Sequence, residues 1–153
     1  MTDPELLAKK LAEIETHVRE LRTEANLSRL REDLKEERFV AHTLQLAVQA
    51  ALDAASHIVA DERLGEPETN QELFALLERH GWVDPSLGAS LRDMARFRNL
   101  LVHGYASIDL DIVRDIVEHH LGDLEAFVET VRGRPDRDQD RDQGRDQDPD
   151  QPG

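Results

Sequence analysis

The residues best suited to chemistry lie together near the end of a predicted helix, in the sequence RNLLVHGY at positions 98–105. Arg98 carries a permanent positive charge and can bind a phosphate group through two parallel hydrogen bonds. His103 is of the side-chain type that best exchanges protons near neutral pH. Together these residues are suited to cleaving a phosphodiester without a metal ion.

In that reaction neutral His103 would take the proton of a ribose 2′-hydroxyl group, which then attacks the adjacent phosphate. Arg98 would stabilise the charge that grows on the phosphate oxygens. Asn99 could donate a hydrogen bond to the phosphate or orient the imidazole. Tyr105 could stack on a base or carry a modification.

The spacing of Arg98 and His103 does not place them on the same face of a helix. Arg98 and His103 are five positions apart, which is a rotation of about 140° on a helix, whereas Asn99 and His103 share a face. The long Arg98 side chain, an opening of the helix near Gly104, or a site built from two protomers would each bring the pair together. Spacing alone also leaves a structural interpretation open, with an arginine on the surface and a partly buried histidine.

Composition favours one all-helical domain. The 153 residues include 39% hydrophobic, 4% aromatic and 34% charged residues, and there is no cysteine. The chain has no apolar run of about 18 residues and no basic, apolar leader at its start. We therefore expect a cytoplasmic protein without a membrane segment.

The charge is strongly acidic, at -14, which argues against broad nonspecific binding of nucleic acid. Arg92 and Arg96 share a helix face close to Arg98 and could guide RNA phosphates. Pairing with the many carboxylates is the alternative for both.

Periodicity predicts an up-and-down antiparallel bundle of about five helices within residues 1–132. Helices are expected from Asp3-Pro4, from about residue 35 to 61, from Thr69 or Asn70 to Gly81, from Asp84-Pro85 to Gly104, and from Asp109 to about Arg132, with a short helix near Ser28. Residues 133–153 contain only Gly, Pro, Arg, Asp and Gln. We predict that this tail is disordered.

Other polar residues gave weaker indications. Gln45, Gln49, Asp53 and His57 form a stripe on the long helix, which is either part of a cleft, a solvated face or a polar seam in a dimer. His119-His120 lacks the spacing of two metal ligands on one helix face. We predict no metal site.

Beyond these patterns, RNLLVHGY resembles the Arg-x4-His-x-Tyr signature of HEPN-domain toxins of the HepT branch, formerly a domain of unknown function. Residues 37–82 and 91–127 resemble the same family, and the likeness extends over about residues 1–132. The resemblance implies an all-helical homodimer that acts as a metal-independent ribonuclease toxin. Arg98 and His103 would be catalytic residues at a cleft on the dimer interface, with Asn99 supporting them.

The resemblance also implies a partner, a minimal nucleotidyltransferase (MNT) antitoxin. That partner, and not this chain, would use ATP and Mg²⁺ to attach AMP to Tyr105, which blocks the cleft with bulk and negative charge. This chain would need no cofactor. The alternative is a non-catalytic helical module that docks a nucleotidyltransferase.

Overall fold

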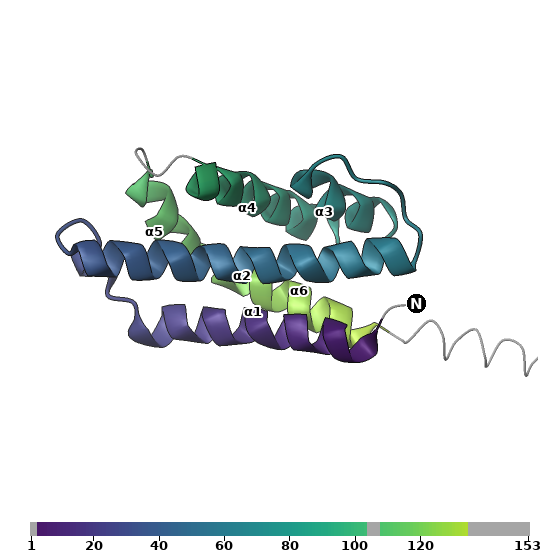
Figure 1. Ribbon diagram of the computed structural model, residues 1–153, viewed down its shortest axis with the longest axis horizontal. Coiled ribbons are helices and arrows are strands. Elements are labelled where there is room, and N and C mark those ends of the chain that lie inside the picture. The colour runs from purple at the N-terminus through teal and green to yellow at the C-terminus, as the bar shows by residue number, and fades with distance from the viewer. Residues whose placement is uncertain (1–2, 104–107, 135–153) are drawn as a thin grey trace, which may run out of the picture.

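The chain folds into a helical bundle in the computed structural model (Figure 1). The structure describes residues 3–103 and 108–134, without the side chains of residues 102 and 103, and these residues include helices but no strand. The elements are α1 (Pro4–Glu24), the 3-10 helix η1 (Leu27–Arg29), α2 (Leu34–Asp61), α3 (Asn70–Arg79), α4 (Pro85–His103), α5 (Leu110–His119) and α6 (Leu121–Gly133). The all-helical prediction is confirmed.

Side chains that cap the first turn determine where several helices begin. The Asp3 carboxylate accepts hydrogen bonds from the backbone of the first turn of α1, with Pro4 as the first helical residue. Thr69, not Asn70, caps α3, and Asp109 caps α5. A cap accepts hydrogen bonds from backbone N–H groups that have no partner within the helix, so these starts could be predicted from the sequence.

Helix α2 is the centre of the bundle and contacts all five other α-helices. In Figure 1 it runs the length of the molecule, with α1 on one side and α3 and α4 on the other. An apolar stripe at helical spacing is buried along its whole length: Val40, Leu44, Val48, Ala51, Ala55 and Ile58. The small alanines let neighbouring helices approach closely, which explains how one helix can pack against five.

The prediction of one last helix is wrong, because the structure divides residues 109–132 into two helices, α5 and α6. The chain bends at His120, whose φ of -124° and ψ of 1° are not helical. The apolar positions keep the same helical period on both sides of the bend, so the pattern could not reveal it. Gly122, a weak helix former, lies two positions after the bend, and the His120 ring spans from Asp115 to Asp123 across it.

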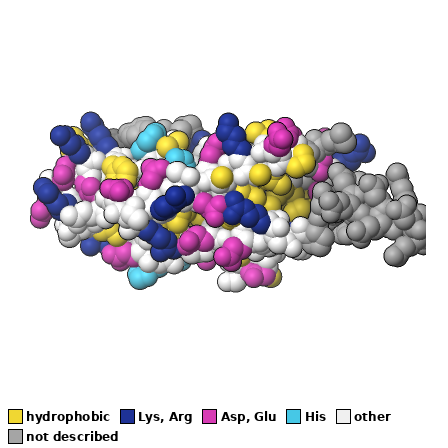
Figure 2. Space-filling view, turned by 90° about the horizontal axis from the view of Figure 1, so that it is seen from below, with side chains coloured by type: hydrophobic (Ala, Val, Ile, Leu, Met, Phe, Trp, Pro, Cys, Tyr) yellow, Lys and Arg dark blue, Asp and Glu magenta, His cyan; other side chains and the backbone are white. Residues whose placement is uncertain are grey.

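Acidic and basic side chains are interspersed over the face shown in Figure 2. Two ion pairs join α1 to α6, one between Arg22 and Glu125 and one between Arg132 and Glu15. Within the described ranges, no helix combines the length and apolarity that crossing a membrane requires.

Arg134, the last residue that the structure describes, contacts Trp82. The Arg134 guanidinium lies 3.8 Å from the centroid of the buried Trp82 ring and donates a hydrogen bond to the carbonyl of Gly81. Trp82 is therefore a packing anchor, buried directly after Gly81. Residues 135–153, which include most of the predicted tail, lie outside the described residues.

Candidate active site

Helix α4 carries the motif and holds it against the core. The Asp84 carboxylate accepts a hydrogen bond of 2.7 Å from the backbone N–H of Leu87, and Pro85 begins the helix. Leu91, Met94 and Leu101 are buried and fix which face of α4 points inward. The helix continues through His103, so Arg98 and His103 belong to one uninterrupted helix. Of the three ways to join them, the opening near Gly104 lies outside the described residues, and the long Arg98 side chain and the second protomer are the other two.

The Arg98 side chain is directed toward Asn99. Its Nη1 donates a hydrogen bond of 3.2 Å to the Asn99 amide oxygen, and both residues are half-buried. The same oxygen accepts a hydrogen bond of 3.1 Å from Nδ2 of Asn70, at the start of α3. Asn99 is thus fixed from a second helix while it holds the guanidinium.

This contact bears directly on the predicted geometric mismatch. Asn99 and His103 are four residues apart and lie on one face of α4. By drawing the guanidinium toward Asn99, the hydrogen bond turns the Arg98 head group toward the face on which His103 lies. The His103 side chain itself is outside the described residues, as is Tyr105.

Arg98 also has a hydrogen-bond donor that is not used within the described structure. Among the described residues it has no carboxylate partner, although the chain contains 33 aspartates and glutamates. Its Nε is buried without a hydrogen-bond acceptor. A buried donor without a partner costs on the order of 1–3 kcal/mol. An arginine that served packing alone would gain by pairing, so this guanidinium is available for an anion.

The two neighbouring arginines differ from Arg98 in this respect. Arg92 is half-buried and pairs with Glu78 of α3, and Arg96 pairs at 3.4 Å with Asp93 of its own helix. Gly88 makes room for the first pair, because a Cβ there would lie 2.2 Å from a Glu78 carboxylate oxygen. Both arginines therefore have carboxylate partners, as the alternative interpretation expected, and Arg96 remains exposed on the face of His103.

The polar stripe of α2 turns toward α1 at its middle. The Asp53 carboxylate accepts a hydrogen bond of 2.9 Å from Gln49 and pairs at 3.3 Å with Lys10 of α1. This contact raises the pKa of Lys10, mainly through the hydrogen bond to Asp53. Asp53 therefore has a structural partner on α1.

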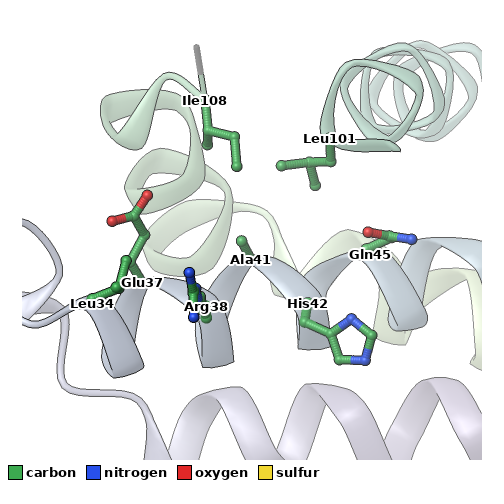
Figure 3. Close-up of a pocket in the computed structure, with 8 residues that line it drawn as sticks. All are labelled: Leu34, Glu37, Arg38, Ala41, His42, Gln45, Leu101 and Ile108. Atoms are coloured by element: carbon green, nitrogen blue, oxygen red, sulfur yellow. The ribbon is translucent and has the colours of Figure 1, made fainter. Parts of the chain in front are cut away.

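A pocket of about 430 Å³ opens beside the end of α4 (Figure 3). Leu101 and Ile108 point toward one another across it, above Ala41 of α2. Arg38, His42 and Gln45 also line it. Arg38 and His42 were not among the candidates predicted from the sequence, although their spacing of four and three positions places them on one helix face with Gln45.

The remaining histidines give no metal centre. His120 lies 3.4 Å from Asp115 and 3.1 Å from Asp123, and Ser90 donates a 2.6 Å hydrogen bond to the same oxygen of Asp123. In the part of the chain that the structure describes, no cluster of three or more histidine or carboxylate groups is arranged to hold a metal ion.

The bundle and the motif at the end of α4 define a class, that of helical HEPN-type proteins. A family profile described as ribonuclease HepT-like matches residues 9–131. The chain belongs to the ribonuclease HepT-like family.

Individual relatives agree with this assignment. The chain is 33% identical over 105 residues to the mRNA nuclease HepT of Shewanella oneidensis, which covers 69% of this chain and 79% of the relative. It is 38% identical over 66 residues to the tRNA nuclease HepT of Aphanizomenon flos-aquae, over 43% of this chain and 45% of the relative. A solved structure of tri-AMPylated Shewanella oneidensis HEPN toxin in complex with MNT antitoxin has a TM-score of 0.79 at 30% identity, covering 88% of this chain and 100% of the other.

Proposed function

We propose that this protein is the ribonuclease toxin of a toxin–antitoxin pair, with Arg98 and His103 as its catalytic residues. The observation that carries the proposal is the hydrogen bond from Arg98 to Asn99, which directs an arginine without a carboxylate partner toward the helix face of His103. Relatives described as mRNA and tRNA nucleases support RNA as the substrate class.

The proposed reaction is an internal transfer within the RNA. The neutral His103 imidazole accepts the proton of a 2′-hydroxyl, and O2′ forms a bond to the adjacent phosphorus. The bond from phosphorus to the 5′-oxygen of the next nucleotide breaks, that oxygen takes up a proton from water, and the His103 imidazolium returns its proton to the solvent. The products are a 2′,3′-cyclic phosphate and a 5′-hydroxyl end.

Arg98 would act on the phosphate and not on the proton. Its guanidinium donates hydrogen bonds to the nonbridging oxygens as negative charge grows on them. Asn99 would be a positioning residue that holds Arg98 in place through its amide oxygen. No step in this scheme requires a metal ion, so we propose metal-independent cleavage.

Regulation and assembly complete the proposal. The solved complex of an AMPylated HEPN toxin with an MNT antitoxin supports a cognate nucleotidyltransferase that transfers AMP from ATP to Tyr105. We also propose a homodimer. Its support is Leu100, which lies between Asn99 and His103 in the sequence and is 60% exposed.

The test is cleavage of mixed cellular RNA by the purified protein in EDTA, with Tyr105 shown by intact mass to be unmodified. The wild type is expected to cleave and to leave cyclic phosphate ends. Arg98→Ala and His103→Ala are expected to lower the rate at least a hundredfold, which is typical for loss of a general base or a charge-stabilising group.

Two matched substitutions control for nonspecific effects. Arg79→Ala removes an exposed arginine at the end of α3, and His119→Ala removes an imidazole that is 65% exposed. Both should keep wild-type rates. If unmodified wild-type protein does not cleave RNA, the alternative of a non-catalytic module that docks a nucleotidyltransferase replaces the ribonuclease.

A further inference from the structure

The pocket beside the end of α4 has the size and lining of a small-ligand site. Its volume of about 430 Å³ falls within the range of pockets that hold small molecules, roughly 300–1,000 Å³. Ala41, Leu101 and Ile108 give it an apolar wall, visible in Figure 3. Leu101 belongs to α4, the helix that carries the motif, but lies about 160° around the helix axis from His103, so the pocket and the motif are on different faces of one helix.

The rim of the pocket supplies polar groups from α2. Arg38 and His42 are exposed and one turn apart, and Gln45 follows on the same face. Among the described residues, neither Arg38 nor His42 has a hydrogen-bond or ion-pair partner. Several other arginines of this chain are paired with carboxylates, including Arg31 with Asp111 and Arg92 with Glu78.

We propose that this pocket binds one nucleotide of the RNA that the protein cleaves. The flat apolar face of a base would lie against Ile108, at the accessible side of the apolar wall, and the Gln45 amide would reach its edge. Arg38 would hold the phosphate of that nucleotide, and His42 would contact the phosphate or the ribose. The inference rests on the proposed ribonuclease function and adds a specificity-determining site to it.

The charges of the pocket favour a nucleotide over an inorganic anion or an apolar ligand. A lone phosphate would leave the apolar wall uncovered, and an apolar molecule would leave Arg38 and Gln45 without partners. Glu37 also lines the pocket, so its carboxylate would disfavour a ligand with dense negative charge. A single nucleotide, with one charge at one end and an uncharged base at the other, fits this distribution.

The test is binding of a short, fluorescein-labelled single-stranded RNA of mixed sequence to full-length protein, measured by anisotropy over a range of salt concentrations. The His103→Ala background keeps the RNA intact. Each phosphate contact contributes about 0.7 to the slope of log affinity against log salt for a single strand. Arg38→Ala should therefore flatten the slope by about 0.7 and weaken binding about tenfold at low salt.

Two further variants separate a contact from a general effect. Lys35→Ala removes an equal charge from the same helix, but Lys35 does not line the pocket, so its slope should match the parent. Gln45→Ala removes an uncharged group and should weaken binding several-fold at every salt concentration without changing the slope.

The outcomes are distinct. Equal slopes for Arg38→Ala and Lys35→Ala would overturn the pocket proposal, even when the wild type cleaves RNA. A shift of Arg38→Ala or Gln45→Ala from dimer to monomer at unchanged RNA affinity per protomer would also overturn it, because the pocket would then be a contact between copies. Failure of the wild type to cleave RNA would instead count against the proposed function.

Discussion

At the scale of single residues, Asn99 determines the position of the Arg98 head group. The positions of Arg98 and His103 are offset by about 140° around the axis of α4, yet in the proposed reaction both residues act on one phosphate. The Asn99 amide oxygen holds the guanidinium on one side and accepts a hydrogen bond from Asn70 on the other. The position of Arg98 therefore depends on α3 as well as on α4.

This dependence predicts that Asn70→Ala lowers kcat although Asn70 touches no substrate. Loss of one hydrogen bond to Asn99 should leave Arg98 less well placed, with a decrease in kcat of about threefold to tenfold and little change in KM. Asn99→Ala, which removes both hydrogen bonds, should lower kcat by about tenfold to a hundredfold. Steady-state cleavage of a fluorogenic RNA gives both constants.

A neighbouring substitution controls for damage to the start of α3. Gln71→Ala removes an amide of similar size at the next position and should leave kcat unchanged. Asn99→Asp adds a sharper readout, because its carboxylate would pair with Arg98 and compete with the phosphate. An Asn99→Asp enzyme with wild-type kcat would contradict the positioning role.

Residue types and spacing predicted Arg98, His103 and Asn99 as candidates, but not the contacts that join Arg98 to Asn99 and Asn99 to Asn70. Asn70 lies 29 positions from Asn99, and no local pattern connects them. His42 has no chemically related residue at a helical spacing that would mark it as part of a site. The pocket that includes it forms only when Leu101 and Ile108 pack over α2.

At the scale of elements, caps and apolar stripes were sufficient to predict most of the bundle. Asp3, Thr69 and Asp109 cap helices as expected, because capping depends on residues within one turn. The bend between α5 and α6 was missed because the apolar period continues across His120. It depends on tertiary packing, which single-sequence patterns do not contain.

The contact between α1 and α6 predicts a dependence of stability on pH. The hydrogen bond from Arg132 holds the pKa of Glu15 below its ordinary value. A carboxylate with a lowered pKa in the folded state stabilises the fold above its unfolded pKa, and this contribution is lost as the pH falls through the folded pKa. Glu15→Gln should therefore destabilise the protein at neutral pH but not in strong acid.

The effect should be small because the two side chains remain 43% and 46% exposed. We expect a loss of at most about 1 kcal/mol in the free energy of unfolding at pH 7, which high salt should reduce further. Urea unfolding at neutral pH and near about pH 3 measures the difference, with Glu5→Gln as an exposed control on the same helix. An equal loss at both pH values would mean that packing, not charge, explains the effect.

At the scale of the whole molecule, the charge of -14 opposes the approach of RNA. Local groups must overcome this repulsion, and the described structure offers two candidates, the Arg98 head group on α4 and the Arg38 side chain at the rim of the pocket. Composition predicted the acidic, helical character of the chain. It could not predict which arginines lack a carboxylate partner, because this depends on which carboxylates the fold brings close to each arginine.

The exposed Leu100 predicts where two copies of the chain meet. A large apolar side chain that is 60% exposed, within the motif itself, gains by being covered. Leu100→Glu should therefore shift the protein from dimer to monomer, because a charge at a dimer contact is costly to bury. Light scattering after size exclusion gives the mass, and the cleavage assay gives the consequence, a loss of activity at low protein concentration.

Ile112→Glu is the matched control, since Ile112 of α5 is another exposed apolar residue, at 42%, outside the motif. It should remain dimeric and active. Circular dichroism should show unchanged helix content for both variants, because neither side chain is in the core. A monomeric Leu100→Glu protein that still cleaves RNA at the wild-type rate would show that each protomer holds a complete site. Loss of activity together with the dimer would place the cleft between two copies, where Arg98 and His103 of each chain meet the RNA.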